Sequence, residues 1–425
     1  IWEDILGRDK IGIKDNFFEL GGHSLKATRL LSRIHKEFSV KLELYDLFTN
    51  FLLEDQAKLI SQSLKSTYEA IAKVENQSDY ALSSSQRRLW VLSQFESGNV
   101  AYNIPVIYVF EGDLNHSVLE KSFYTLIERH EILRTVFKEN EEGEIRQYIK
   151  NISDLGFEIL YKDLRDTKVQ KDELDAIISD DQQSPFDLCN GPLLRACLYQ
   201  TGKSTWIFSY VMHHIISDGW SMGVLIKELM QLYSSYEQGL QNSLSPLRIQ
   251  HKDYAAWQQA ELNGDKLALQ KGYWLEQLSG ELPILELATD KPRPLVKTNN
   301  GAVIQKTLNH SLNKGLKDFS QSHGGTLFMG LLSMVKALLY RYTNQEDIII
   351  GSPIAGRGHA DLEDQIGFYV NTLALRSQFK GNESFKKLFA QVKDVTLGAY
   401  EHQVYPFDEL LEDLDVQRDM SRNPL

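Results

Sequence analysis

Residues 205–221 read TWIFSYVMHHIISDGWS, and this stretch decides the fold that we expect around it. Its first part, residues 205–211, is a short run of aromatic and branched side chains, which predicts a buried strand. Residues 224–233, VLIKELMQLY, carry apolar side chains at helical spacing. Asp218 and Gly219 supply the turn between the two. The stretch therefore predicts a strand, a tight turn and a helix.

Two adjacent histidines, His213 and His214, close the predicted strand and allow several interpretations. Side chains alternate along a strand, so one imidazole should face a cleft while the other is held inside. A metal site needs three or four convergent ligands, which divergent neighbours do not supply. Both histidines can also be satisfied core residues. Residues 219–223, GWSMG, fit the nucleophile elbow of α/β-hydrolases through Ser221, but this short pattern is common by chance and leaves Asp218 unexplained.

The composition excludes several classes of protein. The chain has 425 residues, of which 42% are apolar and 24% charged, so we expect a soluble protein of about three domains. A net charge of −12 argues against nucleic-acid binding, which needs a basic face. We find no apolar run long enough to span a membrane and no signal peptide. The two cysteines, Cys189 and Cys197, are too few for a disulfide framework, and a reducing cytoplasm fits best.

The first 64 residues predict a compact helical unit. A first helix should end near Gly7, a second should begin near Leu25, and another short helix fits residues 52–64. The turn before Leu25 reads GGHSL over residues 21–25. Ser24 there is interpreted either as a helix N-cap or as a modified serine, because the glycines allow close approach and a helix N-terminus favours phosphate. The polar residues 65–79 then predict a linker.

Beyond the linker, strand-like and helix-like runs alternate, which predicts a mixed α/β region. A break between two lobes is expected near residues 280–300, where prolines and an Asn-Asn-Gly turn gather. The predicted strands are residues 106–110, 206–213 and 348–350, and the predicted helices are residues 118–129, 221–238 and 327–342. Because the chain opens within a helical pattern and stops without an obvious finish, we also expect it to be a fragment of something longer.

The motif around Ser24 resembles the peptidyl carrier domains of nonribosomal peptide synthetases. Residues 15–25, DNFFELGGHSL, carry this resemblance, which covers nearly the whole helical unit. It implies a four-helix bundle whose serine, here Ser24, bears a covalent 4′-phosphopantetheine arm. The start of the domain would be truncated.

The rest of the chain resembles the condensation domains of the same synthetases, through seven motifs in family order. They are LSSSQRRLWVL (82–92), RHEILRTVF (129–137), MHHIISDGWS (212–221), DYAAW (253–257), IGFYVNTLALR (366–376), HQVYPFD (402–408) and RDMSRNPL (418–425). Two peripheral motifs depart from the family pattern: His251 stands where tyrosine is usual, and Val404 where aspartate is usual. The motif that holds the active site of the family is whole.

This resemblance implies two chloramphenicol-acetyltransferase-like lobes, with a tunnel that carrier domains enter from both ends. The expected division is a carrier domain at 1–64, a linker at 65–79, an N-terminal lobe at 80–285 and an incomplete C-terminal lobe at 286–425. The reaction implied is attack of an acceptor amine on a donor thioester, so that tethering supplies much of the rate.

Roles for individual residues follow from the family. His214 would take the proton of the amine, orient the amine, or stabilise the tetrahedral intermediate. His213 would be structural. Asp218 would need a cationic partner, for which Arg134 or Arg129 is expected. The N–H group of Gly219 would orient the thioester or its oxyanion.

The resemblance also implies partners. These are adenylation domains, an acceptor carrier, a phosphopantetheinyl transferase and aminoacyl or peptidyl thioesters. The motif subtypes around Ser24 and at residues 83–90 indicate a donor that ends in an L-residue. Two alternatives remain: an epimerisation-type domain, which shares the histidine turn, and a non-catalytic domain that recruits carriers. The second should have lost His214, which is present.

Overall fold

In a computed structural model, the chain is described over residues 1–94, 98–165, 171–262, 264, 266–296, 298, 300–416, 419 and 421–425. It forms two compact units. The first unit comprises Ile1–Ala70, Gly264–Leu362 and Asn371–Leu425, and we call it the carrier unit after the helical segment at its start. The second unit comprises Ile71–Asn263 and Glu363–Val370, and we call it the histidine unit because it contains His213 and His214. This division groups residues by contact, so the domain limits expected at 64, 79 and 285 stay predictions.

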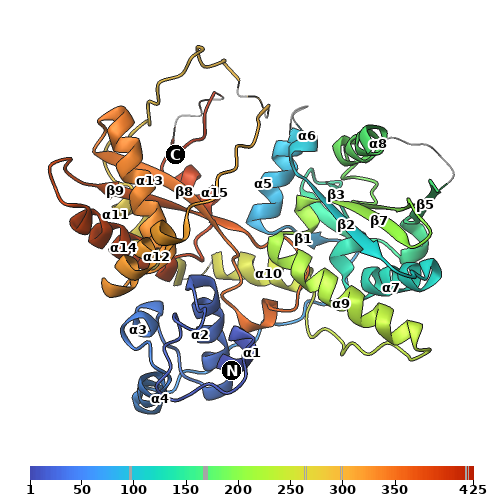
Figure 1. Cartoon of the computed structure of the whole chain (residues 1–425), viewed down its shortest axis with the longest axis horizontal. Coiled ribbons are helices and arrows are strands. Elements are labelled where there is room, and N and C mark those ends of the chain that lie inside the picture. Colours follow the sequence, from blue (N-terminus) through green and yellow to red (C-terminus); the bar gives the residue numbers. More distant parts are fainter. Residues whose placement is uncertain are drawn as a thin grey trace. The chain divides into compact units, whose positions relative to one another are not determined.

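The first part of the carrier unit is a bundle of four helices (Figure 1). They are α1 (Trp2–Leu6), α2 (Ser24–Phe38), α3 (Leu44–Thr49) and α4 (Leu53–Gln62). Their core includes Trp2, Phe17 and Leu30, all buried. Helix α1 ends at Leu6, next to Gly7 as predicted, and Gly7 caps it with a left-handed φ of 67° that suits glycine. The predicted starts of the second and last helices are confirmed to within a residue.

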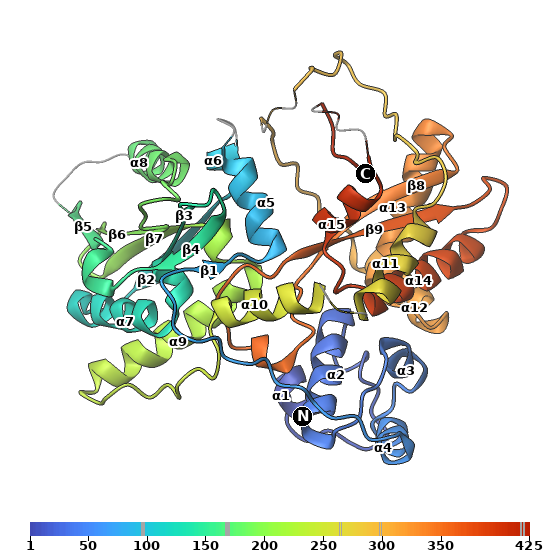
Figure 2. The same ribbon diagram turned by 180° about the vertical axis from the view of Figure 1, so that it is seen from behind.

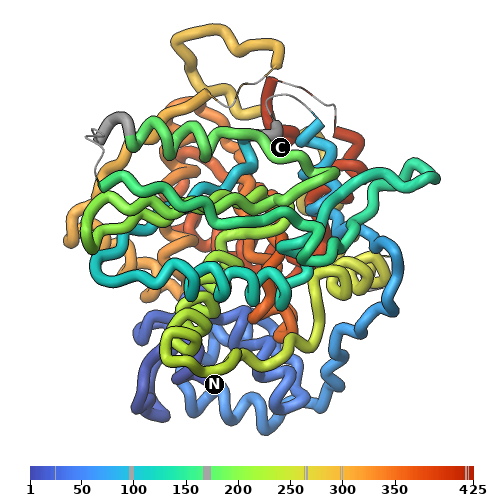
Figure 3. The backbone as a smooth tube through the Cα atoms, turned by 90° about the vertical axis from the view of Figure 1, so that its right-hand side faces the viewer, coloured from blue at the N-terminus to red at the C-terminus, as the bar shows by residue number. Residues whose placement is uncertain are grey.

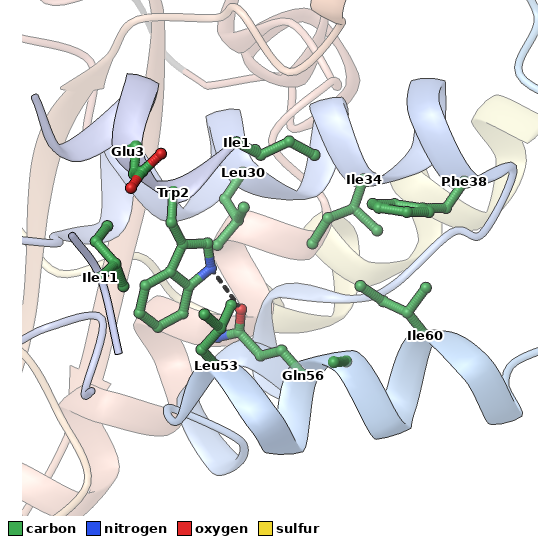
Figure 4. A pocket seen from close by; sticks show the side chains of 11 residues that line it. Ile1, Trp2, Glu3, Ile11, Leu30, Ile34, Phe38, Leu53, Gln56 and Ile60 are labelled. Atoms are coloured by element: carbon green, nitrogen blue, oxygen red, sulfur yellow. Dashed lines mark hydrogen bonds between the residues drawn. The ribbon is translucent and has the colours of Figure 1, made fainter. Parts of the chain in front are cut away.

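A cavity of about 320 Å³ lies between α1, α2 and α4 (Figure 4). Apolar side chains such as Ile34 and Ile60 form most of its lining. The Nε1 atom of Trp2 donates a hydrogen bond to Oε1 of Gln56 at 3.1 Å across one end. This lining holds no cluster of acid, base and nucleophile.

The remainder of the carrier unit packs helices against an antiparallel strand pair (Figure 2). Strands β8 and β9 pair from Asp347 with Gln378 to Ile354 with Asn371. The predicted helix at 327–342 and strand at 348–350 are confirmed. The elements are α11 (Lys266–Gln277), α12 (His310–Ser322), α13 (Leu327–Thr343), β8 (Asp347–Ile354), η4 (Ala360–Leu362), β9 (Asn371–Gln378), α14 (Phe385–Glu401) and α15 (Phe407–Asp413).

Helix α13 places a lysine, Lys336, wholly inside this core. Its Nζ donates to the carbonyl oxygens of Ile348 at 3.0 Å and Leu375 at 2.7 Å. Two acceptors match the two N–H bonds of a neutral amine. Burial lowers the pKa of Lys336 to about 7, against the opposing effect of the Asp347 charge.

The histidine unit is built on a sheet with the strand order β2-β7-β6-β5 (Figure 3). Neighbouring strands are antiparallel except β5 and β6, which are parallel. Helices α7 and α9 cover one face, and α8 packs on the other. These elements are β2 (Asn103–Glu111), α7 (His116–Arg129), β5 (Ile159–Asp163), α8 (Lys171–Gln183), β6 (Leu194–Gln200), β7 (Thr205–His213) and α9 (Gly219–Glu237).

A smaller antiparallel sheet, β1-β4-β3, and several short helices complete this unit. They are β1 (Tyr80–Ala81), α5 (Ser84–Ser93), α6 (Gly98–Ala101), η1 (Glu131–Arg134), β3 (Thr135–Glu139), β4 (Ile145–Ile149), η2 (Ile152–Asp154), η3 (His214–Ile216) and α10 (His251–Leu262).

The core of the histidine unit fixes the stretch on which the fold prediction rested. Phe208 and Tyr210 of β7 pack with Phe123 of α7, and Leu225 and Leu229 of α9 belong to the same cluster. The predicted strand, turn and helix are confirmed. The strand and the helix pack into the same hydrophobic core, which explains why both form here. The turn between them begins at His214, directly after the last strand residue, His213.

Candidate active site

His213 is the last residue of β7 and lies entirely inside the core. Its Nδ1 accepts a hydrogen bond from the backbone N–H of Ile215 at 3.1 Å, which assigns the ring proton to Nε2. Burial, with a smaller contribution from His214, lowers the pKa of His213 to about 3. His213 is therefore a neutral imidazole at ordinary pH.

His214 begins the short helix η3 and is only half-buried. Its backbone N–H donates to the carbonyl oxygen of Tyr102 at 2.8 Å, which fixes the main chain at this point. The Phe368 ring meets the imidazole edge to face, with 4.9 Å between ring centroids and 71° between planes. Of the two adjacent histidines, His214 is the one that reaches the surface of the unit.

Asp218 caps helix α9 and also holds a distant segment. Its Oδ1 accepts from the backbone N–H of Ser221 at 2.8 Å and from Ser221 Oγ at 2.7 Å. Its Oδ2 accepts from the backbone N–H of Tyr369 at 3.2 Å. The carboxylate thus ties the turn after His214 to the segment Glu363–Val370.

Ser221 is wholly buried, and its hydroxyl is engaged by neighbouring groups on several sides. Besides its contact with Asp218, its Oγ lies 2.9 Å from the carbonyl oxygen of Gly367 and accepts from the Gly367 N–H at 3.0 Å. A nucleophile elbow needs an exposed hydroxyl. The hydrolase interpretation of residues 219–223 is therefore wrong.

Gly219 is the first residue of α9 and is exposed. A Cβ atom at this position would meet nothing within 4 Å, so the space beside its backbone is open. The N–H groups of the first helical turn have no partners within the helix and mark its positive end.

The two arginines expected to pair with Asp218 have other partners. Arg129 donates from Nε to Glu228 Oε2 at 3.0 Å, and Arg134 donates to the carbonyl oxygen of Lys150. This corrects the predicted pairing, although both residues still support the unit through these contacts. Glu228, further along α9, escaped the sequence analysis because only the fold brings it to the end of α7.

A glutamine of the first motif also supports the histidine turn. Gln86, on α5, is fully buried and donates from Nε2 to the carbonyl oxygen of Ile215 at 3.3 Å. Its Oε1 accepts from the Ser83 N–H at 3.1 Å, which completes a capping box on α5. The first motif therefore contacts the residue that follows His214.

The fifth motif supports the sixth in the carrier unit. The side-chain amide of Asn371 donates to the carbonyl oxygens of Gln403 at 3.0 Å and Tyr405 at 2.7 Å. Its Oδ1 accepts from the Phe407 N–H at 3.0 Å. The seventh motif, at 418–425, falls partly outside the described residues, since 418 and 420 are among those left out.

Ser24 is the first residue of the 15-residue helix α2, and its side chain lies outside the description. The N-cap is His23, whose Nδ1 accepts from the Lys26 N–H at 3.4 Å, so the interpretation of Ser24 as the cap is wrong. Gly21 has a φ of 100°, and a Cβ at Gly22 would lie 2.4 Å from the Phe17 ring. A helix N-terminus behind two glycines fits a phosphate ester on Ser24.

Two kinds of feature are absent from the described residues. Within them, no group of three or more histidine, cysteine, aspartate or glutamate side chains is arranged to hold a metal ion. Among the described helices, none is both long and apolar enough to cross a bilayer.

Two known families match this chain, one after the other along the sequence. Residues 76–425 match the family described as Condensation domain, which is most of the chain. The chain belongs to the condensation-domain family. Residues 1–60 match the family described as Phosphopantetheine attachment site. The predicted order of a carrier domain and a condensation domain is confirmed, as are the 4′-phosphopantetheine cofactor and the amide-forming class of enzyme.

Relatives of this condensation domain and its carrier are much longer synthases. Tyrocidine synthase 3 of Brevibacillus parabrevis is 42% identical over 425 residues, which is 100% of this chain and 6% of that protein. Gramicidin S synthase 2 of Brevibacillus brevis is 41% identical over 425 residues, again 100% of this chain, and 9% of its own length. The chain therefore spans only a small part of these relatives.

Solved structures confirm the fold of the condensation domain. The X-domain from teicoplanin biosynthesis superimposes with a TM-score of 0.76 at 24% identity, covering 84% of this chain and 78% of that one. The four-domain nonribosomal peptide synthetase AB3403 gives 0.73 at 24% identity, covering 84% and 27%. The predicted class, a helical carrier bundle followed by an α/β condensation domain, is thus confirmed.

Proposed function

We propose that this chain joins two carrier-bound substrates by forming a peptide bond. An acceptor amine attacks the carbonyl carbon of a donor thioester; the C–N bond forms, the C–S bond breaks, and the thiolate leaves. The amine nitrogen loses one proton, and the thiolate gains one. The observation that carries this proposal is the half-buried His214 beside the positive end of α9, on a domain of the condensation family.

His214 is the group that takes the proton from the amine. An α-amino group has a pKa of about 7.7–8.0, so much of it is protonated near neutral pH and needs a base close by. The Nδ1 atom of His214 is buried without a hydrogen-bond partner among the described residues. We therefore assign the proton transfer to Nε2. A positioned base of this kind contributes about 10²–10⁴-fold.

The first turn of α9 orients the donor thioester. As the amine attacks, negative charge develops on the carbonyl oxygen, and backbone N–H groups stabilise such charge well in a site that excludes water. Gly219 is exposed at this end, with open space beside it. His213 and Asp218 hold the turn in place from the core and make no contact with substrate in this proposal.

Ser24 is the attachment point of the arm, which supplies a flexible thiol that holds an acyl group as a thioester. A phosphopantetheinyl transferase adds the arm, and the further partners are adenylation domains and an acceptor carrier. We also propose that the donor ends in an L-residue. This rests on the motifs around Ser24 and at residues 83–90.

A condensation assay with loaded donor and acceptor carriers tests the proposal. The comparison is between the wild-type chain within its synthetase, His214→Ala and a surface control, His310→Ala, whose side chain is exposed. We expect His214→Ala to lose product by about 10²-fold or more and His310→Ala to keep it. Full product from His214→Ala would overturn the assignment.

Two further measurements test the arm and the donor. After treatment with a phosphopantetheinyl transferase, mass spectrometry should show one added arm on wild type and none on Ser24→Ala. Donors ending in an L- or D-residue, assayed in parallel, should differ in rate, with the L-donor faster. Solvent deuterium appearing at the donor Cα would instead indicate an epimerisation domain.

A further inference from the structure

The segment Glu363–Val370 lies in the histidine unit, although the chain on both sides of it belongs to the carrier unit. Within the histidine unit it contacts the turn that carries His214. Its two ends are anchored there. Trp220 donates from Nε1 to the carbonyl oxygen of Glu363 at 2.9 Å, and Ser85 Oγ donates to that of Val370 at 2.9 Å.

Between these anchors, three consecutive residues are held by their main chain. Ser221 Oγ accepts from the N–H of Gly367 at 3.0 Å and lies 2.9 Å from the carbonyl oxygen of Gly367. His251 Nε2 lies 3.3 Å from the carbonyl oxygen of Phe368. Asp218 accepts from the N–H of Tyr369. A Cβ at Gly367 would lie 2.3 Å from the His251 ring, so only glycine fits this close approach.

The Phe368 side chain projects from this held stretch of main chain. Phe368 is only 8% exposed, and its ring meets the imidazole of His214. The χ2 torsion of a histidine, which rotates the imidazole about the Cβ–Cγ bond, has a broad energy profile with two minima. Packing must therefore select one orientation of the ring. Edge-to-face ring contacts stabilise by about 0.5–1.5 kcal/mol, enough to make such a selection.

We propose that Phe368 is a positioning residue that sets the orientation of the His214 imidazole, and that Ser221 acts on His214 through it. This inference rests on the proposed function, because it matters only if His214 serves the reaction. It assigns Ser221 a role unlike that of a nucleophile. The hydroxyl fixes Gly367, the fixed backbone fixes Phe368, and the phenyl ring presents Nε2 of His214 to the amine.

The activity test compares two Phe368 variants. Phe368→Leu removes the ring and keeps an apolar side chain, whereas Phe368→Tyr keeps the ring. We expect Phe368→Leu to lower kcat by about 10- to 100-fold with KM nearly unchanged, because misplacing a reacting group by about 1 Å costs this much. Phe368→Tyr should restore most of the rate. An unchanged kcat in Phe368→Leu would overturn the inference.

A matched control separates positioning from a general loss of packing. Phe157 is 5% exposed in the same core cluster, where its ring contacts Phe123 and Tyr124. Phe157→Leu should lose stability as Phe368→Leu does and keep its kcat. Equal losses of kcat in the two variants would show that packing alone is responsible.

A spectroscopic readout does not depend on activity. In the full chain with labelled histidine, the ring protons of His214 should carry a ring-current shift from Phe368, with His214→Ala identifying the signal. Phe368→Leu should remove this shift, and Phe368→Tyr should keep it. If the His214 ring-proton signals were unchanged in Phe368→Leu, the Phe368 ring would not contact the imidazole and the inference would fail.

Ser221 is tested against a second buried serine. Ser217 is also wholly buried, and its Oγ lies 3.5 Å from the sulfur of Met222. Ser221→Ala should lower kcat and reduce the His214 shift, while Ser217→Ala should do neither. Because Ser221 acts through Phe368, the double variant Ser221→Ala/Phe368→Leu should lose no more kcat than Phe368→Leu alone. Additive losses would contradict this.

The outcomes distinguish this inference from the proposed function. If the wild-type chain gives no condensation product, the proposed function fails. If His214→Ala keeps full product, the role assigned to His214 fails, and the positioning inference fails with it. If His214→Ala abolishes product while Phe368→Leu and Ser221→Ala leave kcat intact, only the positioning inference fails. A covalent acyl adduct on Ser221, seen by mass spectrometry, would overturn its assignment as a positioning residue.

Discussion

The Oε2 atom of Glu228 lies 2.7 Å from Nε2 of His130, and both side chains are buried. The same oxygen accepts from Arg129 at 3.0 Å. Burial would raise the pKa of Glu228, but the hydrogen bonds from His130 and Arg129, together with the Arg129 charge, hold it below its usual value. Burial also lowers the pKa of His130, so the charged pair is Glu228 with Arg129. This contact joins the C-terminal end of α7 to α9.

Glu228→Ala should lower the free energy of unfolding by about 3 kcal/mol, because it leaves the Arg129 guanidinium without its carboxylate. Glu228→Gln keeps an acceptor and should cost less. Urea unfolding measures both. The control is Glu128→Ala, an exposed glutamate on α7, which should stay within about 0.5 kcal/mol of wild type. Similar losses at the two glutamates would contradict this account.

Lys336 should make stability rise with pH in the alkaline range. Its folded pKa is about 7 and its reference value is 10.5, so between these values the unfolded chain binds more protons. The free energy of unfolding therefore increases as pH rises from about 7, by up to about 1.4 kcal/mol per unit. Lys336→Met should remove this slope, and exposed Lys386→Met should keep it. If the free energy of unfolding rose equally with pH in wild type and in Lys336→Met, Lys336 would not be the cause of the rise.

His213 should make stability fall in acid. Its pKa drops from 6.5 to about 3 on folding, so between these values only the unfolded chain binds the proton. The free energy of unfolding then decreases as pH falls from about 6.5 towards 3, by up to about 1.4 kcal/mol per unit. His213→Asn retains an acceptor for the Ile215 N–H and should flatten this part of the curve. The exposed His310→Asn should leave it unchanged.

Gly22→Ala should damage the turn before Ser24. The new methyl group would lie 2.4 Å from the Phe17 ring and 2.5 Å from the Phe17 carbonyl oxygen. Since Phe17 is wholly buried, we expect a loss of about 1–3 kcal/mol and slower addition of the arm. Urea unfolding and mass spectrometry measure these. Gly315→Ala, on the exposed face of α12 with nothing within 4 Å, should instead be neutral or stabilising.

The elements that carry the histidines could be predicted from local sequence. The apolar run of β7 and the helical spacing of α9 are strong periodic signals, and Asp218 with Gly219 marks the turn between them. The structure moves the ends of these elements by only a few residues. Strand alternation also predicts that the two histidines face opposite ways, whereas the choice of His213 as the inward one comes from the family resemblance.

The partners of these residues could not be predicted in the same way. The Ser221 hydroxyl meets the backbone of Gly367, 146 residues away in the sequence, and every residue possesses such backbone atoms. No side-chain pattern predicts such a contact. The only local signal is Gly367 itself, because a glycine often marks a place where another group approaches the backbone closely. The expected pairing of Asp218 with Arg134 or Arg129 failed for a related reason. Opposite charge alone does not choose among several carboxylates, and the fold brings Glu228 to Arg129 instead.

The segment Glu363–Val370 has a consequence for anyone who exchanges parts between synthetases. This segment supplies Phe368, whose ring packs against His214. In the sequence, however, it is separated from the rest of the histidine unit by more than ninety residues of the carrier unit. A crossover at residue 263 would combine His214 from one parent synthetase with the segment Glu363–Val370 from another. A productive hybrid would have to inherit both stretches from the same ancestor.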